Sequence, residues 1–504
     1  MIGCGIEMVK NRMALKLIRK KFIKNKVVRK IYYKFFYKIL VNVGIREQIT
    51  IDDDRLMYDE EDIIQNCQYE IKCSLKDMKD CVGQSEDNIL VAGEILKGKG
   101  LGYFSNKLNH LIDATDFYYL AESEMRDQID FPVFVVPQMF LRNSYKKGEK
   151  LNISKNINEV IGSKEYLKWA VNNTKGRYSD MEEGYAENFV YYSYYYLNKV
   201  LDIIKPKAVV LWLEFYAFHE IFLNICNERG IKVLFFEFGV LPGTYAFETT
   251  GQMGESLPAI NYAEFFDLKV DEDDIIHAQN VIKYLYENRV TRWQQPMNDV
   301  GEIDILKEKL IIGKPVILYA GQNDYESGIR PYGEYARKYH SPVFESSDQA
   351  AVYLGKLAAK NNWNIIYKPH PAVLRFACRQ KEYDIPDNVI IVDRIDINDL
   401  IDMADVLVTI VSQMGYMSLI RGKSAVMLGY TQLRGKSCTY EAFSQSVIEK
   451  VINDAIQFGV TEEQKANFTR HVAQIIKFYV FDDGEEREIR YGKDMVQCME
   501  LMKV

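Results

Sequence analysis

One segment of the chain joins two carboxyl groups to a run of glycines directly after an apolar stretch. Glu237 ends that stretch, and the chain continues through glycines to Glu248 and on to Ser256. An unpaired carboxylate at the end of a buried strand is costly, so we expect the pKa of Glu237 to rise. A group of this kind suits general acid–base or nucleophilic chemistry. The alternative is that Glu237 only accepts hydrogen bonds from N–H groups of the glycine-rich loop.

A second segment, Lys368-Pro369-His370-Pro371, carries a cation and a hydrogen-bond donor on a stiff loop. It follows the apolar run Asn364–Tyr367. Lys368 offers a fixed positive charge, and His370 can reach an oxygen of a phosphate or a sugar. Pro369 and Pro371 restrict the backbone, which would hold the side chains of Lys368 and His370 in place. We therefore predict an anion-binding loop here.

A third segment opens a helix after the apolar run Val406–Thr409. Ser412, Gln413 and Gly415 place a hydroxyl, an amide and free backbone N–H groups at the helix start. Such a start attracts anions, and it suits the phosphate of a nucleotide sugar. The alternative is a plain N-cap at Ser412, with Gly415 allowing close helix packing.

A fourth polar segment follows the apolar run Val316–Ala320. Gln322, Asp324 and Glu326 could hold sugar hydroxyls or a nucleotide there. The next loop, residues 330–340, is long enough to move. Ordinary surface-loop composition accounts for the segment nearly as well.

Alternating strands and helices are expected to position these segments. The first half of the chain has four predicted strands, at Ile89–Ala92, Val133–Val136, Ala208–Leu213 and Lys232–Glu237. Helices are predicted at Asp180–Ile204, His219–Arg229 and Asp271–Trp293. The second half has predicted strands at Val316–Ala320, Asn364–Tyr367, Val389–Val392, Val406–Thr409 and Ala425–Leu428. Its predicted helices are Ser347–Lys360, Asn398–Ala404, Gln413–Arg421, Tyr440–Phe458, one from the capping box Thr461/Gln464 to about Tyr479, and one near Glu485–Met502.

This order predicts an α/β protein of two doubly wound, Rossmann-like units joined near residue 300. In such sheets ligands bind beyond the carboxyl ends of the strands, so two facing units would place a cleft between them. The expected domains are a basic arm over 1–40, an N-terminal domain over 41–296, a C-terminal domain over 297–460 and closing helices over 461–504.

The basic arm has twelve Lys or Arg residues and no acidic residue between Lys10 and Lys38, while the rest of the chain carries a net charge of −19. Apolar residues recur in it at helical spacing. This pattern is typical of an amphipathic helix on an anionic membrane surface, where each basic group contributes roughly 1 kcal/mol. No apolar run of about 18 residues makes it a membrane span. The alternative is a helix docked on the acidic body of the same protein.

The eight cysteines form no Cys-x-x-Cys pair and no metal-ligand spacing with histidine. They predict reduced thiols, and we expect a cytoplasmic protein peripheral to the inner face of the membrane. No strand-end Asp-x-Asp suggests a metal, so we expect no metal and no cofactor. No nucleic-acid-binding module is recognisable, and we expect no nucleic-acid partner.

Taken in order, the four segments resemble the capsule polysaccharide biosynthesis family, which includes Kdo transferases. The resemblance covers roughly residues 200–430. It rests on Glu-x-Gly-x-Leu-Pro-Gly-Thr at 237–244, the loop at Gln322, Lys-Pro-His-Pro at 368–371 and Ser-x-x-Gly at 412–415.

The resemblance implies a GT-B fold that transfers a sugar from a nucleotide-sugar donor to a capsular or other surface glycan. His370 and Ser412 would contact the donor phosphate, and a CMP-activated sugar is implied for the Kdo branch. The acidic residue would be Glu237, with Glu248 as second choice. Glu326-Ser327 stands where Asp-Ser is expected, and Glu248 where Asp is usual, which leaves the donor and the stereochemical outcome open.

Three alternatives remain on sequence grounds. A CDP-glycerol-type polyol-phosphate transferase shares the domain plan, but it calls for paired serines where this chain has only Ser412. A non-hydrolysing sugar-nucleotide epimerase has two such domains but needs no basic arm. A catalytically silent glycan-assembly scaffold would need the same cleft without correct placement of an acid.

Overall fold

The computed structural model describes residues 60–83, 87–92, 117–121, 132–137, 152–177, 184–212, 215–292, 302–370, 383–483, 487–494 and 497. The described residues all belong to one compact unit, Met57–Val504. The predicted basic arm over residues 1–40 lies outside the described residues, and so does Pro371. The predicted membrane contact and cytoplasmic location stay predictions. No helix in the described part of the chain is long and apolar enough to cross a membrane.

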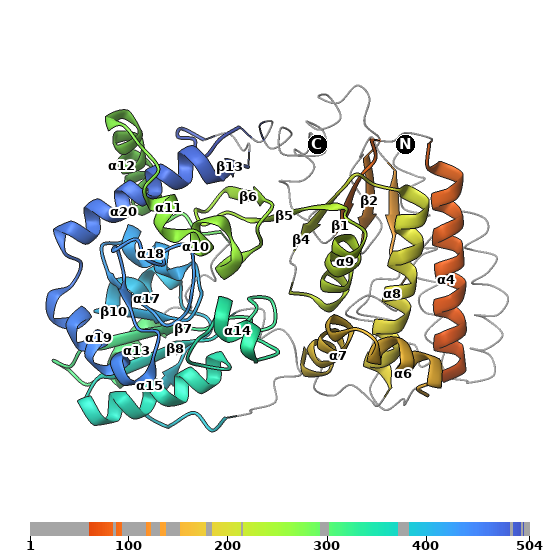
Figure 1. Cartoon of the computed structure of the whole chain (residues 1–504). Coiled ribbons are helices and arrows are strands. Elements are labelled where there is room, and N and C mark those ends of the chain that lie inside the picture. Colours follow the sequence, from red (N-terminus) through yellow and green to blue (C-terminus); the bar gives the residue numbers. More distant parts are fainter. Residues whose placement is uncertain are drawn as a thin grey trace, which may run out of the picture. The chain divides into compact units, whose positions relative to one another are not determined.

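The first sheet has seven strands in the order β13-β6-β5-β4-β1-β2-β3 (Figure 1). Strands β1 to β5 run parallel to their neighbours, whereas β6 is antiparallel to both β5 and β13. Their bounds are β1 Ile89–Ala92, β2 Phe117–Ala121, β3 Val133–Val135, β4 Ala208–Trp212, β5 Lys232–Phe238, β6 Thr244–Glu248 and β13 Val480–Asp482. The helices that share a core with β1 to β5 are α4 Glu60–Cys81, α6 Lys155–Gly162, α7 Glu165–Arg177, α8 Tyr185–Ile204 and α9 Ala217–Glu228.

The second sheet has six parallel strands in the order β12-β11-β10-β7-β8-β9. Its strands are β7 Val316–Ala320, β8 Asn364–Lys368, β9 Val389–Ile391, β10 Val406–Thr409, β11 Ser424–Met427 and β12 Tyr440–Glu441. Its helices are α13 Glu302–Lys309, α14 Glu334–Tyr339, α15 Ser347–Asn361, α17 Ile397–Met403, α18 Met414–Ile420 and α19 Gln445–Phe458. Two mainly parallel sheets, each with packed helices, confirm the predicted α/β, GT-B-like fold class.

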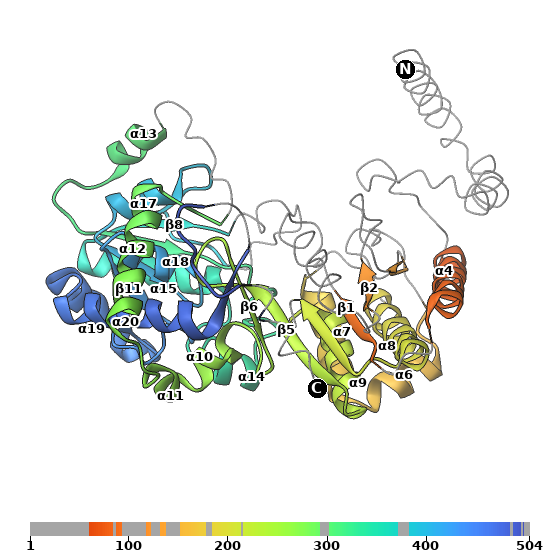
Figure 2. The same ribbon diagram turned by 90° about the horizontal axis from the view of Figure 1, so that it is seen from above.

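A third group of helices packs against the second sheet. It comprises the 3₁₀ helix η4 Met253–Glu255, α10 Leu257–Ile260, α11 Tyr262–Phe266, α12 Glu272–Glu287, α20 Glu462–Gln474 and the π-helix η5 Ile475–Tyr479. Helices α12 and α20 lie side by side (Figures 1 and 2). One hydrophobic cluster joins Val240, Phe265 and Leu285 to Leu318, Leu407 and Val472. The predicted boundary near residue 296 stays a prediction.

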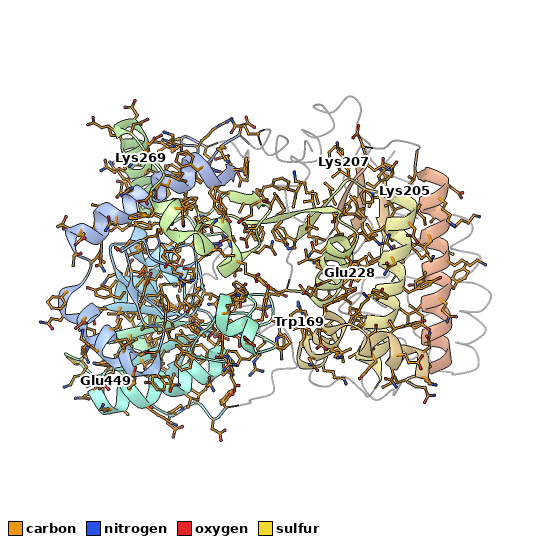
Figure 3. All side chains as sticks on the ribbon, viewed as in Figure 1. Trp169, Lys205, Lys207, Glu228, Lys269 and Glu449 are labelled. Carbon is orange, nitrogen blue, oxygen red and sulfur yellow. The ribbon has the colours of Figure 1, made fainter. Side chains whose placement is uncertain are left out.

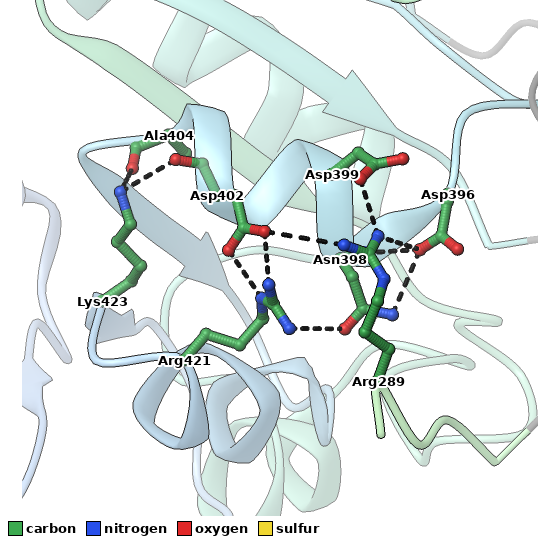
Figure 4. A network of polar contacts seen from close by, with 8 residues as sticks. All are labelled: Arg289, Asp396, Asn398, Asp399, Asp402, Ala404, Arg421 and Lys423. Carbon is green, nitrogen blue, oxygen red and sulfur yellow. Dashed lines mark hydrogen bonds and ion pairs between the residues drawn. The ribbon is translucent and has the colours of Figure 1, made fainter. Parts of the chain in front are cut away.

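Charged networks at the surface tie these helices together. Arg289, just after α12, donates to Asp399 of α17 at 2.6 Å, and Arg421 pairs with Asp402 (Figure 4). Lys423 donates to the Ala404 carbonyl at 2.9 Å, which fixes the other end of α17. Single exposed pairs contribute little, about 0–1 kcal/mol each. The network therefore aligns helices whose stability comes from the core.

Exposed pairs of the same kind surround the first sheet. Figure 3 shows Glu228 at the end of α9, where it pairs with Lys164 at 2.6 Å. Lys207, just before β4, pairs with Asp87 at 2.8 Å.

Of the cysteines, Cys67, Cys226 and Cys438 are buried free thiols. Burial raises the pKa of Cys226 to about 12, which leaves that thiol protonated.

Three predicted helices were wrong in their extent. The helix predicted over 271–293 ends at Glu287, because Arg289 adopts a φ of 50° and turns the chain. The helix predicted from Tyr440 starts at Gln445, since the first two residues form β12. The helix predicted near 485–502 is absent over residues 487–494, where the Tyr491 N–H donates to the Asp482 carboxylate at 3.0 Å instead.

The capping box at the start of α20 is confirmed, with Thr461 and Gln464 bonded reciprocally. Several elements were not predicted at all: β2, β6, β13, α4, α6, α7, α10, α11, α13 and α14. Most are short, and short elements carry too few residues for their periodicity to be recognised. The unpredicted strand β6 matters most, because it places Glu248 beside β5.

A buried lysine joins the third group of helices to the second sheet. Lys436 is fully buried, and its ammonium donates to the carbonyls of Pro258, Tyr262 and Arg434 at 2.9, 2.7 and 3.3 Å. Burial lowers its pKa to about 8. Pro258 belongs to α10 and Tyr262 to α11, so this one donor joins both helices to the loop that contains Arg434.

Replacing Lys436 by methionine should lower the free energy of unfolding by about 1–3 kcal/mol, because the three buried carbonyls lose their donor. Lys450→Met is the matched control, since that side chain is 77% exposed and pairs only with Asp454. It should change stability by less than about 0.5 kcal/mol. Denaturant titration of both variants makes the measurement. Equal stabilities would show that Lys436 does not hold α10 and α11.

Candidate functional site

The carboxyl ends of three strands in the second sheet meet at one edge. Ala320 at the end of β7 is paired with Thr409 of β10 on one side and with Lys368 of β8 on the other. The loops after these strands therefore leave the sheet together. The Gln322 side-chain amide donates to the Thr409 hydroxyl at 3.2 Å, which joins two of the loops directly. The structure thus gathers the predicted donor-binding segments at one edge.

The loop after β7 uses its polar groups to start helix α15. Asp324 accepts the Ser347 N–H at 3.0 and 3.2 Å and the Ser347 hydroxyl at 2.6 Å. The Gln322 N–H donates to the same hydroxyl at 2.9 Å. Burial raises the pKa of Asp324 to about 6. These contacts anchor the loop, and a ligand-binding role for Asp324 and Gln322 stays a prediction.

Glu326 is committed to an ion pair. Its carboxylate pairs with the Arg177 guanidinium from the end of α7. Arg177 also lies over the Tyr216 ring, 4.8 Å from the ring centroid. A sugar hydroxyl would have to compete with this pair for Glu326.

Lys368 is also engaged by the protein. Its side chain is buried, and the ammonium donates to the carbonyls of Ile395 at 2.8 Å and Asp393 at 3.3 Å. Burial lowers its pKa, and the nearby acidic groups oppose that effect. His370 follows on the same loop and is half-buried. A phosphate contact from either residue stays a prediction.

The start of α18 combines a capping role with an available amide. The Ser412 hydroxyl accepts the Met414 N–H at 3.3 Å, as a capping side chain does. A Cβ at Gly415 would lie 3.0 Å from Leu433 and from Met427, so this glycine is explained by close packing. The Gln413 side-chain amide donates to the Phe238 carbonyl at 3.5 Å. That contact brings the start of α18 to the end of β5.

Strand pairing places Glu237 and Glu248 on one face of the first sheet. Glu237 of β5 is opposite Ala246, and Glu248 of β6 is opposite Phe235. The two glutamates are therefore diagonal neighbours, a relation in which side chains interact. Two like charges at such a position oppose each other's ionisation.

The oxygens of Glu248 are occupied by protein donors. The Tyr479 hydroxyl donates to Oε1 at 2.5 Å, and the Leu257 N–H at the start of α10 donates to Oε2 at 2.8 Å. The Thr250 hydroxyl also bonds Oε2. Burial raises the pKa of Glu248 to about 7, against the effect of these hydrogen bonds. Glu248 therefore orders the chain after β6.

Glu237 keeps an oxygen that no donor among the described residues reaches. Its Oε1 accepts only the Met253 N–H, at 3.3 Å, and no hydrogen bond from a described residue reaches Oε2. Desolvation first and the charge of Glu248 second raise the pKa of Glu237 to about 8. The side chain is half-buried, so a ligand can approach it. Of the two carboxyl groups, Glu237 is the one with an oxygen that no described donor reaches, and a catalytic role for it stays a prediction.

The sequence did not indicate the buried pair of His340 and Glu255, which lies in the segment after β6. His340 is fully buried, and its Nε2 lies 3.0 Å from Oε1 of Glu255. The Tyr335 hydroxyl donates to the other oxygen of Glu255 at 2.5 Å. A Cβ at Gly328 would lie 2.5 Å from His340 Nε2, so the ring needs a glycine there. The sequence feature that could have indicated this pair is the presence of glycines at 254 and 328, each close to a polar residue.

Gly254 allows the loop after β6 to approach the residue before His340. A Cβ at position 254 would lie 1.9 Å from the Tyr339 carbonyl oxygen. Gly254→Ala should therefore lower the free energy of unfolding by about 1–3 kcal/mol through overpacking.

The matched control is Gly333→Ala, because nothing lies within 4 Å of a Cβ there and the φ of −175° is extended backbone. Its effect should stay below about 0.5 kcal/mol. The melting temperatures of the two variants, compared with that of the wild type, measure the difference. An equal, small effect of both would show that the approach at Gly254 is loose.

The ionisation of Glu237 should make stability depend on pH. Its ordinary pKa is 4.5, and its folded value is about 8, so the folded state holds the proton more tightly. The stabilisation is complete below about pH 4.5 and is lost as the pH rises through about 8.

Glu237→Gln should match the wild type near pH 4.5 and unfold at a higher temperature than the wild type near pH 9. Glu264→Gln, an exposed glutamate of α11, should follow the wild type at both pH values. Melting curves across this pH range make the measurement. Parallel curves for Glu237→Gln and the wild type would contradict the raised pKa.

Among the described residues, no group of three His, Cys, Asp or Glu side chains is arranged to hold a metal ion.

Residues 278–451 match the family model described as capsule polysaccharide biosynthesis protein. The resemblance to this family is confirmed. The matched region contains Gln322, His370 and Ser412, whereas Glu237 and Glu248 precede it. The matched region thus contains the whole second sheet and its strand-end loops.

Solved structures with partial similarity include two KpsC transferases from Thermosulfurimonas dismutans. The beta Kdo 2,7 transferase is 18% identical, covers 61% of this chain and 87% of its own, and has a TM-score of 0.36. The beta Kdo 2,4 transferase is 15% identical, covers 59% and 87%, and has a TM-score of 0.39. A UDP-GlcNAc 2-epimerase from Neisseria meningitidis is 10% identical, covers 76% and 97%, and has a TM-score of 0.26. No match was found among curated proteins.

Proposed function

We propose that this chain is a glycosyltransferase that moves a sugar from a nucleotide-sugar donor to a capsular or other surface polysaccharide. The observation that carries the proposal is Glu237, a carboxyl group with a raised pKa and one oxygen that no donor among the described residues reaches. It stands next to Phe238, whose carbonyl contacts Gln413 at the start of α18. The proposed proton acceptor, Glu237, therefore lies close to the start of α18, where the phosphate would bind.

In this proposal the donor lies on the loops after β7, β8 and β10. Its phosphate faces Ser412 and His370, because a hydroxyl, an imidazole and helix N–H groups suit an anion. The engaged side chains, Asp324 and Lys368, hold these loops in place. A CMP-activated sugar such as CMP-Kdo is the first donor to test, since the family resemblance implies it.

Glu237 acts as the general base. Its carboxylate takes the proton from an acceptor hydroxyl while that oxygen forms a bond to the anomeric carbon. The bond from the anomeric carbon to the nucleotide phosphate breaks, and the nucleotide leaves with the electron pair. Proton transfer of this kind contributes about 10²–10⁴-fold to the rate.

Glu237→Gln should lower kcat by about 10²–10⁴-fold and leave donor binding intact, because the amide keeps the shape without the base. The wild-type kcat should rise with pH and level off above about pH 8, because the Glu237 carboxyl group loses its proton there. Nucleotide release from the donor, with and without glycan acceptor, measures both quantities. Glu264→Gln is the control, and an equal loss in both variants would contradict the role of Glu237.

Donor class can be read from thermal stability, because a ligand at 100 times its Kd should stabilise the folded state by about 2.7 kcal/mol. We expect one of CMP-Kdo and the CDP, UDP and GDP sugars to raise the melting temperature, and His370→Ala to abolish that rise. A response to CDP-glycerol alone would favour a polyol-phosphate transferase. No response to any nucleotide at millimolar concentration would favour the silent scaffold.

A further inference from the structure

Arg292 is anchored on the two residues that follow Glu237. Its guanidinium donates to the Gly239 carbonyl and lies over the Phe238 ring, 4.9 Å from the ring centroid. A planar guanidinium is suited to both contacts at once. The side chain therefore clamps the turn at the end of β5.

Arg292 differs from the neighbouring arginine in its charge partners. Arg289, three residues earlier, pairs with Asp399 at 2.6 Å and lies near Asp396 and Asp402. No carboxylate of the described residues lies within ion-pair distance of Arg292. Its positive charge is thus left to act on the groups around the turn.

The charged and titratable groups around Glu237 come from three elements. Glu248 lies diagonally on β6, and Tyr479 comes from the π-helix η5. Tyr245 of β6 stacks on Phe238 and interacts with Arg292. Arg292 itself comes from the segment after α12. Burial first and the charge of Glu248 second disfavour the carboxylate form of Glu237 and raise its pKa, whereas the Met253 N–H and, to a smaller degree, Arg292 favour that form.

We propose that Arg292 is a positioning residue that holds the turn next to Glu237 and, by its nearby positive charge, favours the ionised form of that carboxyl group. The proposal rests on the proposed function for its catalytic meaning, since Glu237 must be the base. Arg292 touches the backbone and the Phe238 ring, and it acts on the acceptor proton only through Glu237. A base beside a second carboxylate needs such a cation to ionise near neutral pH.

The direct test is a pH titration of Glu237 in the folded protein. Infrared difference spectra between each protein and its Glu237→Gln partner isolate the protonated carboxyl band. Arg292→Met should move the midpoint upward by about one pH unit, because an opposite charge has been removed. Arg292→Lys should restore most of the wild-type midpoint. Arg292→Gln, which keeps a donor toward Gly239, serves if the methionine variant does not fold.

Arg289→Met is the matched control, since it removes the same charge three residues away and should leave the midpoint unchanged. An unmoved midpoint in both Arg292→Met and Arg292→Gln would overturn the proposal. An equal shift in Arg289→Met would also overturn it, because the effect would then be one of net charge.

Kinetics separate this inference from the proposed function. In an active wild type, Arg292→Met should move the acid limb of kcat to higher pH and leave the donor KM unchanged. A raised donor KM with an unmoved limb would instead make Arg292 a ligand for an anionic group of the substrate, and the proposal would fail. If the wild type transfers no sugar, the proposed function fails, while the infrared titration still decides the role of Arg292.

Discussion

The antiparallel pairing of β5 with β6 is the constraint on which the candidate site depends. The chain leaves a buried parallel strand at Glu237, turns through Gly239 and Gly243, and returns beside the same strand. A parallel connection would have carried the next carboxyl group to the far side of a crossover helix. The hairpin instead places Glu248 diagonally to Glu237, and the segment after it supplies the Met253 N–H. The short strand supplies the neighbouring charge, and the segment after it supplies the hydrogen bond.

The structure divides the polar residues of the site into those already bonded and those still available. Asp324 caps α15, Lys368 holds two carbonyls, and Glu248 accepts three donors. Buried polar groups need hydrogen-bond partners, so most of these side chains hold the loops in place. Glu237 is the exception, because one oxygen has no donor among the described residues. Its destabilised ionisation is the kind of local cost that functional sites retain.

The sequence predicted the second sheet well, because parallel strands buried on both faces appear as continuous apolar runs. All five of its predicted strands are present, and Thr461 starts α20 as its capping pattern required. The predicted donor segments share one edge because strand-end loops of a parallel sheet must do so. The strand β6 was not predicted, since its five residues lie between glycines and were interpreted as loop. The burial of Lys436 and His340 could not be predicted, as both depend on contacts between segments more than 80 residues apart.

A crystal structure with the nucleotide of the preferred donor would test the central claim most directly. We expect its phosphate beside Ser412 and the N–H groups that open α18, with the sugar end toward Oε2 of Glu237. Such a complex would also show whether Lys368 releases its carbonyls to bind the phosphate. A nucleotide bound away from the carboxyl edge of the second sheet, with Glu237 facing no ligand, would contradict the account.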